Sequence, residues 1–386
     1  MAIFTKMRFA FYTLGCKTNQ YETQAMEHIL QNQGHEIGHF DEKCDAYIIN
    51  PCSVTAIADK KNRAVIRRCR RENPKAVIGV CGCYTQHAPE AVKELGVDVL
   101  GGSGGRQEFL EHMLAALQGE DHVDTLDNAL RRREFELLPP GGLEERTRAM
   151  LKVQDGCNNF CTYCVIPYTR GRIRSLPPDE MARQAAHLAE EGYRELVLTG
   201  IEIASYGRDL PGTLTLADAV ETVAAAAPQM RLRLGSIEPT VITEDFCRRA
   251  AATGQVCRHF HLSLQSGCDR TLARMNRKYT TAEFLACVER LRRYFPGCAL
   301  TADMITGFPG ETEDDQAQAV AFLEQVGFAA VHVFPYSRRP GTKADAMPEQ
   351  LSHAVKSARA HAAQRVADDC KQRYLAQQIG QVLPVL

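Results

Sequence analysis

The sequence predicts an α/β protein made of two units, a parallel sheet covered by helices and, after it, a partly closed barrel. Three observations support this fold class. Short apolar segments alternate with helical segments over residues 7–118, the alternation stops over residues 119–147, and from residue 148 it resumes and repeats six times. Such alternation is typical of parallel sheets whose faces are covered by helices.

The first unit, residues 1–118, is predicted to be a Rossmann-like parallel α/β domain. Strand candidates lie at residues 7–14, 45–50 and 76–80, and helices cover residues 21–33 and 56–72. The β–α pattern continues to residue 117. In sheets of this kind the carboxyl ends of the strands carry the functional loops.

Residues 119–147 are predicted to be a linker with room for one edge strand. They are charged, contain Pro139-Pro140-Gly141-Gly142 and show no sustained periodicity. Proline, glycine and polar residues without a hydrophobic period are typical of connecting segments.

The second unit, residues 148–345, is predicted to form a partial (β/α)6 barrel, followed by a helical C-terminal segment over residues 346–386. Strand candidates lie at 149–153, 195–199, 231–235, 259–264, 300–305 and 330–334, and helices at 179–191, 216–226, 281–294, 314–326 and 352–378. Six β–α units are fewer than the eight of a closed barrel. By analogy, the active site is expected at the C-terminal ends of the strands.

Composition limits the function classes. The chain has 386 residues with 46 Lys and Arg against 47 Asp and Glu, which excludes a globally basic nucleic-acid binder but not a local basic patch. There is no long apolar run and no secretory leader, so we expect no membrane partner and a cytoplasmic location. The 15 cysteines form an odd number in a long chain without an export signal, a pattern that favours metal binding or redox chemistry over disulfides.

Cys157, Cys161 and Cys164 form a C-x3-C-x2-C motif just after the first predicted barrel strand. Three thiolates at this spacing can hold three irons of a [4Fe-4S] cluster and leave the fourth iron open for another ligand. Three buried thiols or an incomplete zinc site are the alternatives.

With Tyr163 before its last cysteine, this motif resembles that of the radical S-adenosylmethionine enzymes. The resemblance implies that the open iron binds the methionyl group of S-adenosyl-L-methionine and that Tyr163 lies near its adenine. One electron from the cluster would then cleave the sulfonium, giving a 5′-deoxyadenosyl radical that removes hydrogen from an unactivated carbon.

A second trio consists of Cys16 in TLGCK, Cys52 in NPCSV and Cys83 in GCYTQ. Each follows a strand candidate, so all three can converge at one edge of the sheet. The trio resembles the auxiliary-cluster ligands of the methylthiotransferases, a branch of the same enzymes, which implies a second [4Fe-4S] cluster. Cys81 is a nearby competitor, but the family pattern of Gly-Cys after a strand favours Cys83. The remaining cysteines are interpreted as buried apolar residues, Cys81 among them.

The resemblance covers nearly the whole chain and is closest to the MtaB-type tRNA methylthiotransferases, on the segments TLGCKTNQYET, RLRLGSIEP, HLSLQSGCDRTLARMNRKYT, MITGFPGET and FPYSRRPGTKA. It implies methylthiolation at C2 of N6-threonylcarbamoyladenosine-37 in tRNA. The alternatives are the same reaction on N6-isopentenyladenosine-37 or on an aspartate of ribosomal protein S12. Gly-Cys-Lys at residues 15–17 argues against the isopentenyladenosine enzymes, and Arg339-Pro340 argues against the S12 enzymes. A non-catalytic iron–sulfur RNA-binding protein is the remote alternative.

Two departures from the family pattern stand out. The usual Asn-Thr-Cys is Asn50-Pro51-Cys52 here, and proline removes a backbone N–H that could reach a cluster sulfur. The family continues into a small RNA-binding β-barrel, the TRAM domain, and this sequence stops at Val382–Leu386, about where that barrel would begin. We therefore expect the TRAM domain to be absent.

Polar and small residues at the predicted strand ends are candidates for binding S-adenosyl-L-methionine, with barrel packing or capping as the alternative role. Glycine would permit close backbone approach to the methionyl group. Arg277 could pair with the cofactor carboxylate, with an RNA phosphate or in a surface salt bridge. The strand-end candidates are Thr199, Gly200, Ser236, Glu238, Gln265, Asp303 and Gly307.

The predicted helix over residues 56–72 carries a basic stripe, with Lys60, Arg63, Arg67 and Arg71 on one face. Such a stripe suits RNA phosphates, and a solvated helix face is the alternative. The expected partners are tRNA, whose single-stranded anticodon loop presents an unstacked base cheaply, and an electron donor such as flavodoxin or ferredoxin. Nothing in the sequence demands more than a monomer.

Overall fold

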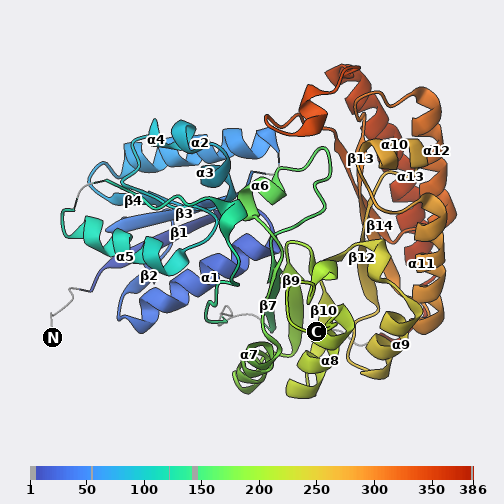
Figure 1. Ribbon diagram of the computed structural model, residues 1–386, viewed down its shortest axis with the longest axis horizontal. Coiled ribbons are helices and arrows are strands. Elements are labelled where there is room, and N and C mark those ends of the chain that lie inside the picture. The colour runs from blue at the N-terminus through green and yellow to red at the C-terminus, as the bar shows by residue number, and fades with distance from the viewer. Residues whose placement is uncertain (1–5, 54, 121, 141–146, 384–385) are drawn as a thin grey trace.

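The computed structural model describes residues 6–53, 55–120, 122–140, 147–383 and 386. It confirms the predicted fold class: Figure 1 shows a sheet flanked by helices on the left and the barrel strands with their outer helices on the right. Residues 141–146 of the predicted linker lie outside the described ranges. Within those ranges, no helix is both long and apolar enough to cross a membrane.

The N-terminal sheet has six strands, all parallel, in the order β2-β1-β3-β4-β5-β6. Its central strands confirm the three predicted ones, and β6 is an edge strand contributed by the predicted linker. The strands are β1 (Arg8–Leu14), β2 (Glu36–Gly38), β3 (Ala46–Pro51), β4 (Val77–Val80), β5 (Val99–Leu100) and β6 (Val123–Asp124).

Helices cover both faces of this sheet. One hydrophobic cluster joins it to α1 and α5, and another joins it to α2, α3 and α4. The helices are α1 (Lys17–Asn32), α2 (Ala56–Glu72), α3 (Cys83–His87), α4 (Pro89–Lys93) and α5 (Arg106–Leu117). α1 begins four residues before the predicted start at residue 21, because its first turn buries the polar residues Thr18 and Asn19, which hydrophobic periodicity does not detect.

The barrel strands form two four-stranded sheets, β10-β9-β7-β8 and β11-β12-β13-β14. β10 and β11 are separated only by Gly235, so this part of the chain pairs first with β9 and then with β12. The six predicted strands are all present. The barrel strands are β7 (Arg148–Asp155), β8 (Arg174–Ser175), β9 (Glu195–Gly200), β10 (Arg231–Leu234), β11 (Ser236–Ile237), β12 (His259–Gln265), β13 (Ala299–Thr306) and β14 (Ala330–Pro335).

The outer helices pack on these strands through one large hydrophobic core. In β12, Phe260, Leu262 and Leu264 are fully buried in that core, whereas the alternate residues are only half-buried and line the inner face. These outer helices are α7 (Pro178–Glu190), α8 (Leu216–Ala226), α9 (Glu244–Ala252), α10 (Asp269–Arg274), α11 (Thr281–Tyr294), α12 (Glu313–Val326) and α13 (His353–Ala376). The short helix α6 (Ile166–Arg170) packs instead on α3 and on residues 129–131. Short 3-10 turns are η1 (Ala129–Arg131), η2 (Ile203–Ser205), η3 (Pro239–Val241) and η4 (Lys343–Ala346).

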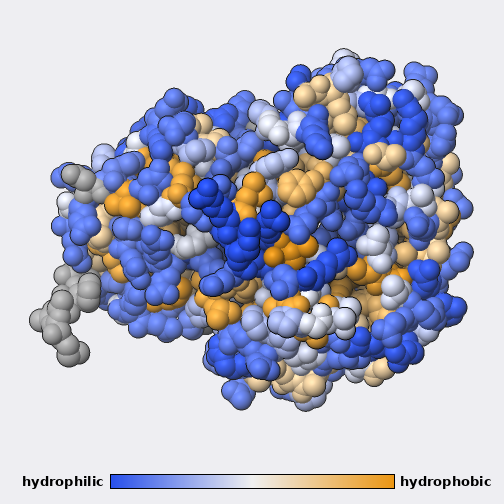
Figure 2. Space-filling view, viewed as in Figure 1, coloured by the Kyte–Doolittle hydropathy of each residue, from blue (hydrophilic) through white to orange (hydrophobic). Residues whose placement is uncertain are grey.

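The N-terminal sheet and the barrel meet along α1, which contacts β7 and β9. Tyr21 and Ala25 of α1 pack on Met150 and Val197 of the barrel, and the Tyr21 hydroxyl donates to the Leu138 carbonyl at 3.2 Å. Figure 2 shows hydrophobic and strongly hydrophilic residues side by side in the middle of this face, where the two units adjoin in Figure 1.

Candidate functional site

The motif of Cys157, Cys161 and Cys164 lies on a loop between β7 and α6. Gly156 precedes it with φ +73°, and a Cβ atom there would lie 1.8 Å from the Arg172 carbonyl oxygen, so only glycine fits. Backbone N–H groups fix both ends of the loop, that of Cys157 to the Gly171 carbonyl at 3.0 Å and that of Cys164 to the Cys161 carbonyl at 2.9 Å. The loop is therefore held in one shape by the residues around it.

Inside this loop, Phe160 has a left-handed backbone with φ +46°. A non-glycine residue in this region is uncommon and costs free energy. The Asn276 side chain compensates, because its Nδ2 donates to the carbonyls of Asn159 at 3.2 Å and Phe160 at 3.1 Å. Asn276 thus ties the cysteine loop to the segment after α10.

The three thiols of this loop are largely withdrawn from solvent. Burial raises the pKa of Cys164 to about 12 and also raises the pKa of Cys157. Metal binding must therefore displace their protons, since thiolates are the ligands. One Nη of Arg277 donates to the Cys161 sulfur at 3.2 Å.

The second trio lies at the carboxyl ends of three neighbouring strands. Cys16 precedes α1 after β1, Cys52 follows β3, and Cys83 begins α3 after β4. A Cβ on Gly15 would lie 2.8 Å from the Cys52 Cβ, so the first two loops are in contact. A Cβ on Gly82 would lie 3.0 Å from the Pro51 carbonyl oxygen, so the third loop contacts the second. The sheet therefore brings these loops together at one edge.

Cys83 and Cys81 have different surroundings. Cys81 is fully buried in the core between the sheet and α5, beside Phe109, as expected of a small core residue. The Cys83 sulfur accepts a hydrogen bond from Arg170 Nε at 3.1 Å. Burial raises the pKa of Cys83 and the Arg170 charge opposes that rise.

Both trios fit an iron–sulfur cluster in their donor set. All fifteen cysteines are free thiols, and each trio has one sulfur that accepts a hydrogen bond from an arginine, as cluster sulfurs do. In the described ranges no group of three Cys, His, Asp or Glu converges enough for a single metal ion. A cubane is larger than one ion, so its ligands lie farther apart.

A barrel residue also supports the Cys52 loop. Arg339 is 2% exposed, and its two Nη atoms contact Asp59 at 2.7 Å and the Ser53 hydroxyl at 2.6 Å. Ser53 directly follows Cys52, so the Arg339-Pro340 segment of the barrel is in direct contact with the second trio's surroundings.

Two of the predicted binding residues lie directly beside the first trio. Glu238 is buried, accepts a hydrogen bond from Asn159 Nδ2 at 3.1 Å and pairs with Arg277 at 3.2 Å. Of the three roles open to Arg277, the structure shows an ion pair, and it is internal rather than on the surface. Tyr163 packs edge-on against Phe308, with 6.5 Å between ring centroids.

The other strand-end candidates are more dispersed. Thr199 and Gly200 end β9, where a Cβ on Gly200 would lie 2.7 Å from the Gln154 carbonyl oxygen, so this glycine has a packing role. Ser236 is exposed in β11, and Gln265 ends β12 with φ +61°. These four residues therefore lie on successive strands of the barrel.

Asp303 and Gly307 lie farther along the chain. Asp303 is inside β13 and contacts His261 at 3.3 Å. Gly307 has φ +69° and is packed against α13, since a Cβ there would lie 2.6 Å from the Lys356 Cγ. The close packing against α13 therefore explains why residue 307 is a glycine.

The sequence did not predict a network of buried charges that lies between the two units. The Glu22 carboxylate of α1 forms ion pairs with Arg106 at 2.7 Å and Lys152 at 2.9 Å, and it also pairs with Arg170. Burial alone would raise the pKa of Glu22, but these three cations hold it well below its usual value. Lys152, the charge within the otherwise apolar predicted strand 149–153, is a sequence signal that could have indicated this network.

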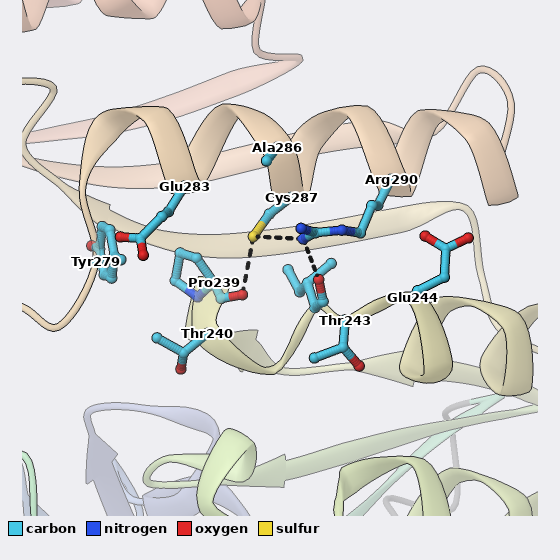
Figure 3. Close-up of a pocket in the computed structure, with 10 residues that line it drawn as sticks. Pro239, Thr240, Thr243, Glu244, Tyr279, Glu283, Ala286, Cys287 and Arg290 are labelled. Carbon is cyan, nitrogen blue, oxygen red and sulfur yellow. Dashed lines mark hydrogen bonds between the residues drawn. The ribbon is translucent and has the colours of Figure 1, made fainter.

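A cavity of about 410 Å³ lies elsewhere, between η3, α9 and α11 (Figure 3). There the Cys287 thiol donates to the Pro239 carbonyl at 3.1 Å, and Arg290 donates to the Ile242 carbonyl at 2.8 Å. None of the residues that line this cavity was a candidate site residue, so it is distinct from the two cysteine trios.

Two family models and many sequence relatives match this chain. Residues 151–323 match the family model of the Radical SAM superfamily, and residues 8–102 match that of Uncharacterized protein family UPF0004. The chain is 39% identical to Threonylcarbamoyladenosine tRNA methylthiotransferase MtaB of Bacillus subtilis, over 98% of this chain and 84% of that one. It is 32% identical to tRNA-2-methylthio-N(6)-dimethylallyladenosine synthase of Pelotomaculum thermopropionicum, over 98% and 86%.

Solved structures support the fold alone. The radical S-adenosylmethionine methyltransferase TsrM from Kitasatospora setae, with cobalamin and a [4Fe-4S] cluster bound, superposes with a TM-score of 0.63 at 17% identity, over 88% of this chain and 77% of that one. The cobalamin-dependent radical enzyme OxsB gives 0.59 at 12% identity, over 96% and 56%. The matching family models and the sequence relatives show that the chain belongs to the methylthiotransferase family of radical S-adenosylmethionine enzymes.

Proposed function

We propose that this protein is a tRNA methylthiotransferase that modifies C2 of N6-threonylcarbamoyladenosine-37. The observation that carries the proposal is the pair of cysteine trios at adjoining edges of the sheet and the barrel. The relative from Bacillus subtilis named for threonylcarbamoyladenosine is 39% identical to this chain, and the relative from Thermoanaerobacter sp. named for dimethylallyladenosine is 33% identical.

In this proposal each unit holds one [4Fe-4S] cluster. Residues 1–118 hold the auxiliary cluster through Cys16, Cys52 and Cys83. The barrel, residues 148–345, holds the other through Cys157, Cys161 and Cys164, with S-adenosyl-L-methionine beside it. When bound, the barrel cluster supplies the electron that makes S-adenosyl-L-methionine a source of radical chemistry, and flavodoxin or ferredoxin is the class of donor that would reduce it.

The chain's own residues shape this centre. Arg277 is held by Glu238 and donates to the Cys161 sulfur, so it fixes one ligand and adds positive charge beside the cluster. Tyr163 presents a half-buried ring for the adenine, and Thr199, Ser236, Gln265 and Asp303 supply hydrogen-bonding groups on the inner side of the barrel. Residues 119–147 connect the units, and residues 346–386 add the outer helix α13.

A nucleoside profile of tRNA tests the substrate. In a strain that lacks this gene, we expect the 2-methylthio derivative of N6-threonylcarbamoyladenosine to be lost and the unmodified parent nucleoside to accumulate. Mass spectrometry of digested tRNA measures both, and the intact gene should restore the derivative. Loss of the methylthio group from isopentenyladenosine, with the threonylcarbamoyl derivative intact, would instead establish the alternative substrate.

The exposed face of α2 is the proposed contact for RNA phosphates. Lys60, Lys61 and Arg67 are exposed and have no acidic partner among the described residues, whereas Arg71 of the predicted stripe pairs with Glu72 at 3.2 Å. Arg63 donates a hydrogen bond to the Tyr84 hydroxyl at 3.0 Å. The basic face is therefore shorter than the sequence indicated.

Replacing Lys60, Lys61 and Arg67 together by alanine is expected to weaken tRNA binding about tenfold at 0.1 M salt, because each phosphate contact releases counterions. The slope of log Kd against log salt should fall by about 2 for three lost contacts. Filter binding at several salt concentrations measures both quantities. The matched control is R71A, which removes a cation already paired with an acid; an equal loss in the control would assign the effect to general charge rather than to this face.

A further inference from the structure

Arg170 links the barrel to the second cysteine trio. It is the last residue of α6, is fully buried and reaches into the N-terminal unit. Its Nε donates to the Cys83 sulfur at 3.1 Å, and one Nη donates to Asn19 Oδ1 and Glu22 Oε2, each at 3.1 Å. Three partners are thus satisfied by one planar guanidinium, which a lysine ammonium cannot reproduce.

The same side chain is connected to the first trio. Its other Nη lies 3.7 Å from the Asp155 carboxylate, and that carboxylate accepts the backbone N–H of Gly156 at 2.8 Å. Cys157 follows Gly156 and donates its own N–H to the carbonyl of Gly171, the residue after Arg170. One buried arginine therefore contacts Cys83 directly and the loop of Cys157 through Asp155.

Arg170 lies in a positively charged interior. Four cations, Arg106, Lys152, Arg170 and Arg174, are buried with two carboxylates, Glu22 and Asp155, and the half-buried Glu136 accepts the backbone N–H of Arg106, so four cations face three carboxylates. Charges interact strongly where water is excluded. Net charge and hydrogen bonds to the sulfurs are among the factors that set the potential of an iron–sulfur cluster, and positive charge favours the reduced form.

We propose that Arg170 is a positioning residue that holds Cys83 as a ligand and raises the reduction potential of the cluster bound by Cys16, Cys52 and Cys83. This inference rests on the proposed function, because it requires that the second trio hold a cluster. Arg277, which donates to Cys161, has the corresponding place at the first trio. The two clusters should therefore respond to different arginines.

The experiment uses the full chain, reconstituted with iron and sulfide without oxygen, in two backgrounds. C157A/C161A/C164A keeps only the second trio, and C16A/C52A/C83A keeps only the first. R170K and R277K are matched substitutions, since both keep the charge and lose one hydrogen bond to a sulfur. Redox titration followed by electron paramagnetic resonance gives the midpoint potential in each case.

We expect R170K to lower the midpoint potential of the cluster in the second-trio background and to leave that in the first-trio background unchanged. R277K should lower the midpoint potential in the first-trio background and leave that in the second-trio background unchanged. Loss of iron from folded R170K protein in the second-trio background alone would also support the proposal, because it would show that Arg170 holds Cys83. Circular dichroism verifies that the variant is folded. An unchanged potential, or equal shifts in both backgrounds, would overturn it.

A second variant covers the case in which R170K does not fold. R170M removes the donor to Cys83 together with its charge but keeps Glu22 paired with Arg106 and Lys152, and Asp155 paired with Lys152 and Arg174, so neither buried carboxylate loses all of its partners. It should lower the potential of the second-trio cluster in the same way, and an unaltered potential would overturn the proposal. If the second-trio background binds no iron with Arg170 intact, the auxiliary cluster of the proposed function fails and this inference fails with it. If the cluster binds but its midpoint potential does not change when Arg170 is replaced, only the inference is overturned.

Discussion

Replacement of Cys161 by alanine is expected to abolish the formation of 5′-deoxyadenosine and to remove about half of the iron from the reconstituted protein. Cys161 is the most buried thiol of its trio and accepts a hydrogen bond from Arg277, and alanine has no sulfur to bind iron in its place. Loss of even an outer partner of a metal site costs 10- to 100-fold, so loss of a ligand should exceed about 100-fold. Chromatography of the reaction with dithionite and an iron assay measure the two effects.

Two further variants sharpen this prediction. C81A removes a thiol from the core two residues before Cys83, and it should retain both the iron and the 5′-deoxyadenosine. C83A should lose iron and methylthio transfer while 5′-deoxyadenosine still forms, because the barrel trio is intact. If C161A still cleaves S-adenosyl-L-methionine at the normal rate, the assignment of this trio is wrong.

Replacement of Glu22 by alanine should have the largest effect on stability, a loss of about 3–5 kcal/mol in the free energy of unfolding. Glu22 is fully buried, and its removal leaves Arg106, Lys152 and Arg170 without their shared carboxylate. Urea unfolding at pH 7 measures the change. The exposed Glu36, which pairs with Lys6 and Arg8 on the surface, is the control, and E36A should cost far less.

The effect of Glu22 should depend on pH. Because its pKa is lowered in the folded state, the carboxylate contributes stability above its unfolded pKa of roughly 4.3 and loses that contribution as the pH falls toward the folded pKa. The difference between wild type and E22A should therefore be largest near neutrality and smaller at pH 3. A difference that stays constant over this range would contradict the assignment of a buried, ionised Glu22.

Features encoded over short distances in the chain were predicted well. Thr280 and Glu283 form a capping box at the start of α11, and the helix has the predicted bounds Thr281–Tyr294. The three cysteines of the barrel trio lie within eight consecutive residues of the loop between β7 and α6. Spacing alone brings them together, because a loop this short cannot separate them widely.

The second trio required more than spacing. Cys16, Cys52 and Cys83 approach one another because β3 lies between β1 and β4 in the sheet, and strand order is a property of the tertiary fold. The choice between Cys81 and Cys83 likewise depends on orientation, since one faces the core and the other faces Arg170. Resemblance to a family singled out these loops, and the strand order explains why they meet.

The sequence by itself determined the α/β class, the succession of sheet and barrel, and the two sets of cysteines, because apolar periodicity and motif spacing are local properties of the chain. Only the tertiary structure decided which charges are buried together. Glu22 and Arg170 are 148 positions apart, and ionisable side chains are by default solvated, so no local pattern identifies them as partners. Their pairing exists because α6 packs on α3 and η1 and so brings the Arg170 side chain to α1, where water is removed from both groups. Each charge then depends on the other.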